Sequence, residues 1–135
     1  MNEPTVVVRF DENGRVYHPG ETLQGEYLLR SVAPGEVKAI EVSVLWYSEG
    51  KGDEDLAVHE FSRLDAEAGD WIDPHRPGQF SSKLPNSPLS YEGIIVKLRW
   101  CVRVRVFLER GKEFLGEQEF RLGEVPASSV LGQEQ

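Results

Sequence analysis

The sequence contains one cysteine, Cys101, among 135 residues, so no disulfide can form within the chain. Small extracellular domains commonly depend on disulfides, and a lone cysteine is more typical of a reducing compartment. The first residues lack the basic and apolar segments of a signal peptide, and no apolar run approaches the roughly 18 residues that cross a bilayer. The sequence therefore predicts a cytoplasmic protein without a membrane span.

Positive charge is also scarce. Lysine and arginine number 15 against 23 aspartates and glutamates, which gives a formal net charge of −8 at pH 7. Binding to nucleic acid needs a basic surface, so this balance excludes nucleic acid as the main partner. The length suffices for one hydrophobic core. We expect a single domain over residues 1–125 and a flexible C-terminal tail over residues 126–135.

The familiar sequence signatures of catalysis are missing. The chain has no Gly-x-Ser-x-Gly elbow, no phosphate-binding loop and no dinucleotide fingerprint. Cys101 would act as a nucleophile only beside a histidine, and its place in the middle of an alternating segment favours a structural role. The sequence thus predicts a non-enzymatic protein with no catalytic residue, no cofactor and no metal.

The clearest positive feature is strict alternation over residues 94–108. Apolar side chains occupy every even position: Ile94, Val96, Leu98, Trp100, Val102, Val104, Val106 and Leu108. Cations occupy several odd positions: Lys97, Arg99, Arg103 and Arg105. Successive side chains of a strand point to opposite faces, which predicts a buried apolar row and a charged row that faces water or a partner. This run exceeds the usual strand length, so a bend or bulge is expected within it.

Shorter segments of β character fill most of the remaining chain. Strands are predicted over residues 5–10, 15–18, 22–30, 37–47, 55–64, 79–84 and 114–122. Alternation predicts a core between two sheets formed by Ile40, Val42, Val44, Trp46, Trp100, Val102 and Val104. Many short strands joined by glycine and proline turns indicate an all-β fold of two packed antiparallel sheets with seven to eight strands.

Two segments each contain a distinctive series of turn residues. Residues 14–27 (GRVYHPGETLQGEY) contain a tyrosine, a Pro-Gly-Glu turn and a second glycine: Tyr17, Pro19, Gly20, Glu21 and Gly25. Residues 84–93 (LPNSPLSYEG) contain a Leu-Pro pair, a spaced proline and a Ser-Tyr-Glu-Gly turn before the long strand. In this order and spacing the chain resembles the N-terminal domain of the arrestin-like family, as a single-domain relative of bacterial type. The resemblance implies an immunoglobulin-like β-sandwich of arrestin type and a role as a protein-binding scaffold or adaptor.

The chain departs from this family in ways that narrow the expected role. Animal arrestins join two such domains, whereas 135 residues accommodate one, and whether another chain supplies a second domain stays open. Arrestins that sense phosphate carry paired lysines at the end of the first strand, where this chain has Arg9 followed by Phe10 and Asp11. The ligase-recruiting Pro-Pro-x-Tyr motif of arrestin-domain adaptors is also missing. These departures argue against a phosphate-triggered switch.

The charged row of residues 94–108 has two interpretations. In the first, a docking surface for a protein partner or an acidic segment comprises Lys97, Arg99, Arg103 and Arg105 with the outward-facing Leu45 and Tyr47, next to Cys101 and Phe107. In the second, the cations only pair across strands with glutamates such as Glu26, Glu41, Glu117 and Glu119. A homo-oligomer is a further interpretation of the outward apolar side chains.

The irregular segment 66–78 is the basis for an alternative hypothesis about the function. Asp70, Asp73 and His75 are potential metal ligands, which would support a small-molecule or metal-assisted enzyme. The spacing matches neither a calcium loop nor a typical zinc site. The competing interpretation is a surface loop that Trp71 anchors to the domain.

Two glycines serve as a check on the resemblance. Gly20 and Gly93 each follow turn-forming residues and precede a strand. We expect each to have a positive φ or a close backbone neighbour, because a side chain would be excluded from such a turn.

Overall fold

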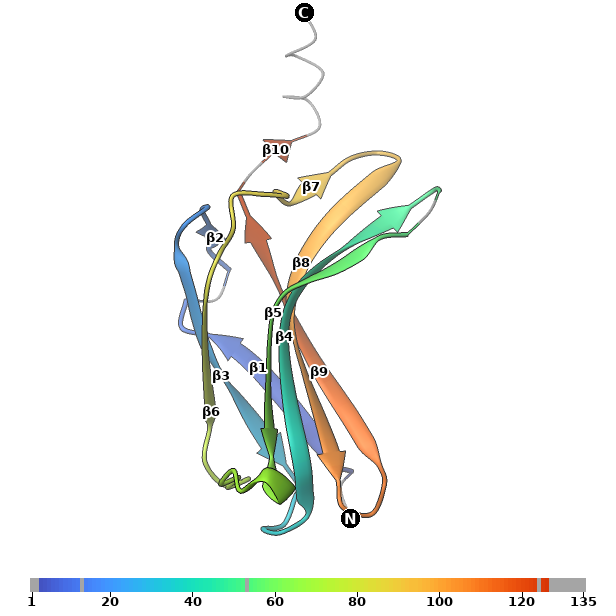
Figure 1. The fold of residues 1–135 in the computed structure, drawn as a ribbon. Coiled ribbons are helices and arrows are strands. Elements are labelled where there is room, and N and C mark those ends of the chain that lie inside the picture. The colour runs from blue at the N-terminus through green and yellow to red at the C-terminus, as the bar shows by residue number, and fades with distance from the viewer. Residues whose placement is uncertain (1–2, 13, 53, 124, 127–135) are drawn as a thin grey trace, which may run out of the picture.

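The computed structural model describes residues 3–12, 14–52, 54–123 and 125–126, so nearly all of the predicted tail lies outside the described residues. The strands form two facing sheets (Figure 1). The smaller sheet has the order β1-β3-β6, with β1 (Thr5–Phe10), β3 (Thr22–Arg30) and β6 (Gly78–Lys83). The larger sheet contains β2 (Val16–Tyr17), β4 (Val37–Gly50), β5 (Leu56–Asp65), β7 (Tyr91–Glu92), β8 (Val96–Leu108), β9 (Glu113–Leu122) and β10 (Val125–Pro126).

The predicted all-β sandwich is confirmed. In the larger sheet the strand order is β10-β7-β8-β4-β5, with β9 on β8 and β2 on β9. The long pairings are antiparallel, and two-residue parallel contacts join β2 to β9 and β10 to β7. A short 3₁₀ helix, η1 (Ala66–Ala68), follows β5. No helix in the described part of the chain is long and apolar enough to cross a membrane.

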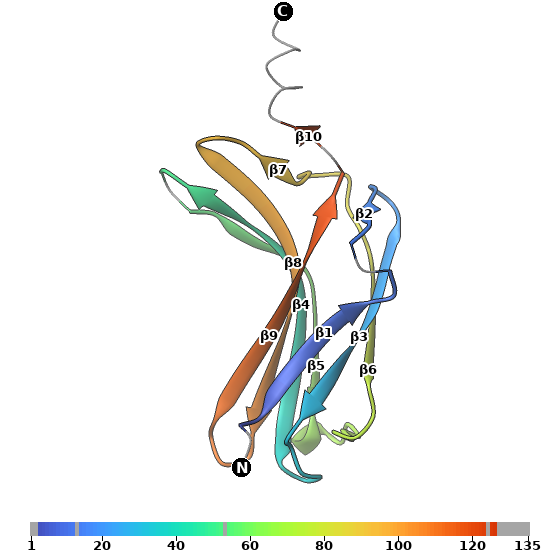
Figure 2. The same ribbon diagram turned by 180° about the vertical axis from the view of Figure 1, so that it is seen from behind.

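The core lies between the two sheets, and alternation predicted most of it. Ile40, Val42 and Val44 on β4 are each at most 9% exposed, as are Trp100, Val102 and Val104 on β8. Trp46 was expected among them and is only half-buried. It lies near the end of the β4–β5 hairpin, which projects past the smaller sheet (Figure 2) and so receives less cover from it.

The start of the long strand also differs from the prediction. Ile94 was expected in the buried row but is 93% exposed, and β8 begins at Val96. The Gly93 N–H donates to the Val96 carbonyl at 3.0 Å, which closes a turn that lifts Ile94 and Ile95 off the sheet. Turn geometry therefore overrides alternation at this end.

The two glycine turns agree with expectation. Gly20 has φ of 85°, and a Cβ placed on Gly93 would lie 2.6 Å from the Val96 oxygen. That distance is shorter than real side-chain contacts, so Gly93 is required by a close backbone approach.

A β-bulge reshapes the edge of the larger sheet. Val44 of β4 pairs with Glu60 of β5, whereas Leu45 pairs with Val58, so His59 is the extra residue. We call the side of this sheet that faces away from β1, β3 and β6 the outer face. Figure 1 shows that β4, β5 and β8 bend as they extend past the smaller sheet, which places the bulge near a curved outer surface.

Candidate functional site

The predicted docking residues lie together on the outer face. The register of β8 against β9 and β4 determines which side chains lie beside them. On the β9 side, Cys101 of β8 is opposite Glu119, and Arg103 is opposite Glu117. On the β4 side, Tyr47 is opposite Arg99, and Leu45 is opposite Cys101. The cation row of β8 therefore runs beside an acidic row of β9, a placement that favours cross-strand ion pairs.

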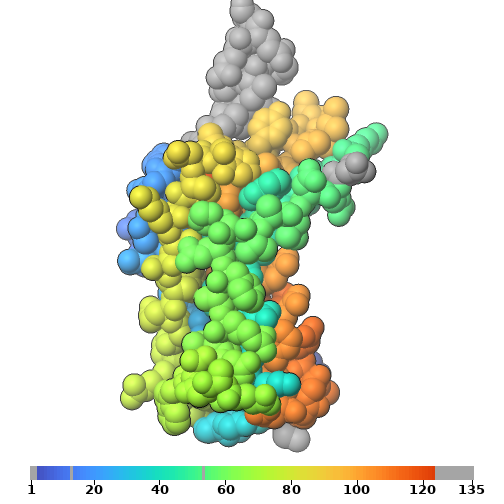
Figure 3. Space-filling model, viewed as in Figure 1, coloured from blue at the N-terminus to red at the C-terminus, as the bar shows by residue number. Residues whose placement is uncertain are grey.

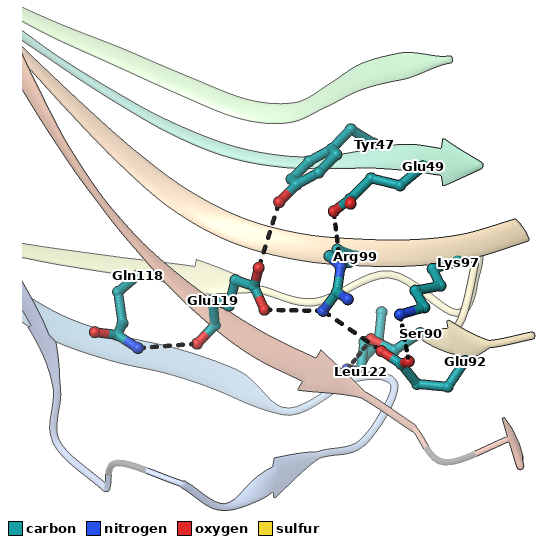
Figure 4. Close-up of polar contacts among 9 residues, drawn as sticks. All are labelled: Tyr47, Glu49, Ser90, Glu92, Lys97, Arg99, Gln118, Glu119 and Leu122. Carbon is teal, nitrogen blue, oxygen red and sulfur yellow. Dashed lines mark hydrogen bonds and ion pairs between the residues drawn. The ribbon is translucent and has the colours of Figure 1, made fainter. Parts of the chain in front are cut away.

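Arg99 is the centre of a polar cluster (Figure 4). Its guanidinium lies 2.8 Å from Glu49, 3.3 Å from Glu119 and 3.4 Å from Glu92. Partial burial would lower the pKa of Arg99, but the carboxylates of Glu119, Glu92 and Glu49 more than offset this and raise it above its ordinary value. Arg99 therefore stays charged and is committed to three carboxylates of its own chain.

Two further cations of the row are paired as well. Arg103 Nε lies 2.7 Å from Glu117, and Lys97 Nζ lies 3.8 Å from Glu92. Arg105 has no ion pair with any residue that the structure describes. Three of the four cations therefore form ion pairs with glutamates of neighbouring strands.

The glutamates that take part were predicted only in part. Glu117 and Glu119 pair as expected, whereas Glu41 pairs with Arg63 and Glu26 with Arg9. Glu49 and Glu92 were missed: Glu49 belongs to a continuation of β4 past Tyr47, and Glu92 to the short strand β7, which pairs with the start of β8. The longer alternation of β4 could have revealed Glu49; β7 is too short to leave a pattern.

Tyr47 joins the same network through its hydroxyl, which donates to Glu119 Oε1 at 3.4 Å. Burial, reinforced by the negative charges of Glu119 and Glu49, raises the pKa of Tyr47 to about 12. The phenol is therefore neutral near pH 7 and acts as a hydrogen-bond donor. Its ring also borders a hollow of about 420 Å³ on the outer face, with Leu56, Arg103 and Glu117 among the lining residues.

Leu45 and Cys101 do not contribute to an exposed apolar patch. Leu45 and Cys101 are each only 1% exposed, although both face outward by parity and lie outside the inter-sheet core. They oppose each other in the middle of the sheet, where Val58 flanks Leu45 and Glu119 flanks Cys101. Leu45 therefore supports the outer face from beneath and offers no contact area of its own.

The buried thiol has little nucleophilic character. Burial, together with the nearby carboxylate of Glu117, raises the pKa of Cys101 to about 12. The attacking species in thiol chemistry is the thiolate, which is almost absent at pH 7 for such a group. This agrees with the structural role that its sequence position favoured.

Sequence reasoning missed a row of exposed apolar side chains on β5. Leu56, Val58 and Phe61 point to the outer face opposite Tyr47, Leu45 and Ser43, and they are 56%, 51% and 54% exposed. We call these three residues the β5 row. The bulge at His59 moves the apolar positions from even to odd numbers, so simple alternation conceals that they share a face. Figure 3 shows β5 in green, uncovered at the edge of the larger sheet that faces the viewer.

The segment 66–78 does not have either of its predicted arrangements. Trp71 is 85% exposed and anchors nothing, whereas the following Ile72 packs against the core. Asp73 Oδ1 accepts a hydrogen bond from the His75 N–H at 2.9 Å, and Asp70 Oδ2 accepts one from the Asp65 N–H at 2.8 Å. Among the described residues, no group of three or more histidine, cysteine, aspartate or glutamate side chains is arranged so that it could hold a metal ion.

Comparison with known proteins supports the fold alone. No family model matches the sequence, and no curated protein matches it. Among solved structures, the chain is similar to Spo0M, a sporulation control protein from Bacillus subtilis, with a TM-score of 0.65 and 16% identity. The match covers 93% of this chain and 51% of Spo0M, so the chain spans about half of that protein's length. The shared architecture is an arrestin-like sandwich, as the turn motifs implied.

Proposed function

We propose that this domain is a non-enzymatic protein-binding module, a scaffold or adaptor that holds an extended segment of a partner protein against β5. The observation that carries the proposal is the β5 row, whose three apolar side chains are each more than half exposed on one face of an edge strand. Adjacent exposed apolar groups on a folded domain commonly mark an interaction surface.

The edge position of β5 supports the same role. This ten-residue strand pairs with β4 on one side and has no second ladder partner among the described residues. Side chains of β5 connect its middle to β6: the Ser82 hydroxyl donates to Glu60 at 2.6 Å, and the His59 ring lies 2.8 Å from the Lys83 carbonyl. A free strand edge binds an extended peptide through backbone hydrogen bonds, while alternate side chains provide selectivity.

The charge of the outer face bears on the chemistry of the partner. Because Lys97, Arg99 and Arg103 are already paired, an acidic partner segment would find Arg105 as its available cation. Arg105 lies on β8, two strands from β5, which is about 10 Å at the usual strand spacing. We therefore propose a partner segment whose alternating apolar side chains lie along β5 beside Tyr47, and which carries a separate acidic group that meets Arg105.

Exchange of Phe61 for serine tests the β5 row. Wild type, Phe61→Ser and the matched control Leu115→Ser, which alters an outer-face residue of β9 with 50% exposure, are immobilised and exposed to an extract of the source cells. We expect a protein that wild type and the control retain and Phe61→Ser loses. A peptide from that protein should then bind Phe61→Ser about tenfold more weakly in calorimetry, as expected for an apolar anchor.

Two results would contradict the proposal. One is that Leu115→Ser loses the same protein, which would show a general effect of reduced surface apolarity. The other is a partner peptide with equal affinity for wild type and a folded Phe61→Ser variant. Sedimentation of the wild-type protein distinguishes a separate partner from a second copy of this chain.

Arg103 and Arg105, both in the cation row of β8, provide a matched test of charge. Arg103→Glu should lower the free energy of unfolding by about 1 kcal/mol, because it removes the pair with Glu117 and places a second carboxylate opposite Glu117. Arg105→Glu should change stability by less than about 0.5 kcal/mol and slow association with the acidic partner segment. Thermal melts and stopped-flow association rates measure both effects. If Arg105→Glu destabilised the fold and left association unchanged, the acidic contact would be wrong.

A further inference from the structure

A second surface, away from the outer face, has the features of a ligand site. A hollow of about 600 Å³ lies between the segment that follows η1 and the turn before β4, and Glu109 lines it from the β8–β9 connection. We call it the Trp71 hollow. Its apolar lining includes Val37, which is 5% exposed, and Ile72, which packs against the core. The hollow is therefore built on the rigid part of the domain.

The exposure of Trp71 at this hollow is unusual. Indole is the largest side chain and is normally buried for most of its surface, yet Trp71 is 85% exposed while its neighbour Ile72 takes the buried position. Leaving such a ring in water forfeits the stabilisation that burial would provide. An exposed indole beside a hollow is available to stack on a ligand.

The segment that presents Trp71 is held by a clamp of hydrogen bonds. The Asp70 N–H donates to the Asp65 carbonyl at 3.1 Å, and the Asp65 N–H donates back to Asp70 Oδ2 at 2.8 Å. Gly69 ends η1 with φ of 97°, in the left-handed region. Because the backbone before Trp71 is already ordered, binding costs little additional chain entropy.

The polar lining of the hollow is predominantly acidic. Asp70, Asp73 and Glu109 contribute carboxylates, and His75 also lines the hollow. Arg76 lies 3.7 Å from Asp73 and is largely exposed. Asp70 has one oxygen engaged by the Asp65 N–H, and no described residue bonds to the side chain of Glu109. Carboxylates only accept hydrogen bonds, so the site suits a ligand that donates and carries positive charge.

We propose that the Trp71 hollow binds a cationic side chain with an apolar stem, namely a lysine or arginine displayed on a protein. The stem would lie against the apolar lining, and the cation would meet the Trp71 ring between Asp70 and Glu109. Tryptophan is the best aromatic partner for a cation, and adjacent carboxylates add charge complementarity. A neutral sugar would also stack on Trp71, but it carries no positive charge to complement the three carboxylates of the lining.

The indole N–H signals of a ¹⁵N-labelled sample allow a direct test. The chain has three tryptophans, and the Trp71 signal is identified by its loss in Trp71→Phe. The probes are N-acetyl-lysine methylamide, its neutral norleucine counterpart and methyl glucoside. We expect the lysine probe alone to shift the Trp71 signal saturably, with less binding at higher salt.

Paired charge variants locate the site. Glu109→Gln should weaken binding of the lysine probe by about twofold to fivefold, the range for one exposed charge pair. Glu113→Gln makes the same chemical change on β9 outside the hollow and should leave binding unchanged. Equal shifts with norleucine would overturn the proposal in favour of a purely apolar hollow, and shifts with the glucoside alone would indicate a sugar site.

A Trp71 signal that responds to none of the probes also overturns the proposal. The result of the lysine titration is independent of the β5 row, because Phe61→Ser should leave that titration unchanged. Failure of one site therefore does not imply failure of the other.

Discussion

Replacement of Trp100 by alanine is expected to lower the free energy of unfolding by about 3–5 kcal/mol. Trp100 is 1% exposed, and its ring lies 5.8 Å from that of Phe120 between centroids. Its Nε1–H also donates to the Pro88 carbonyl at 2.8 Å, so truncation leaves both a cavity and a carbonyl without its donor. Urea denaturation followed by far-ultraviolet circular dichroism measures the loss.

Two further variants distinguish the loss of a buried, hydrogen-bonded side chain from the mere replacement of a tryptophan. Trp71→Ala makes the same exchange at a side chain that is 85% exposed and should change stability by less than about 0.5 kcal/mol. Trp100→Phe keeps an aromatic ring but removes the donor to Pro88, and should cost about 1–3 kcal/mol. Equal stability of Trp100→Ala and wild type would contradict the inter-sheet core described for β8.

Alternation predicted the inter-sheet core because a strand has only two faces. Parity within residues 94–108 predicts a buried even row, which holds from Trp100 to Leu108 but not for Ile94 and Val96, and the same logic on β4 gives Ile40, Val42 and Val44. Turn chemistry at Gly20 and Gly93 supplied an independent constraint on where strands begin. Local pattern and turn residues together suffice for a sandwich, since both act within a few residues.

The candidate site depended on contacts that sequence pattern does not encode. Parity places Leu45 on the outer face but does not reveal that Val58 and Cys101 enclose it across two ladders. The bulge at His59 likewise hides the shared face of Val58 and Phe61, because one extra residue reverses parity. Such features follow from register and bending, which long-range packing decides.

The choice of ion-pair partners shows the same limit. Candidate acids were abundant, and only the register of β8 against β9 selects Glu117 for Arg103. Arg99 goes further and gathers carboxylates from three different strands, β4, β7 and β9. A row of basic residues in the sequence therefore identifies a polar face. Which of its cations stay unpaired depends on the carboxylates that the neighbouring strands place beside them.

Substitution of Gly25 by alanine should destabilise the domain by about 1–3 kcal/mol, opposite in sign to the usual effect. Gly25 lies in β3 between Phe10 of β1 and Phe80 of β6, and its φ is not positive. At an unconstrained position, alanine would stabilise by about 0.4–1 kcal/mol through the unfolded state. Here a Cβ would collide with the backbone oxygen of Arg9 and with Cζ of Phe80.

A double variant separates the two collisions at Gly25. Phe80 is a side chain that can be shortened, so Gly25→Ala combined with Phe80→Leu removes the contact with the ring while the contact with the Arg9 carbonyl persists. We expect Phe80→Leu to recover part, but not all, of the stability that Gly25→Ala loses. Urea denaturation of wild type, both single variants and the double variant measures this coupling. Gln24→Ala, at the adjacent exposed position of β3, is the control and should be nearly neutral. A stable Gly25→Ala variant would show that β1 and β3 can separate at this point, and would remove the steric reason for a glycine in this part of the arrestin-like signature.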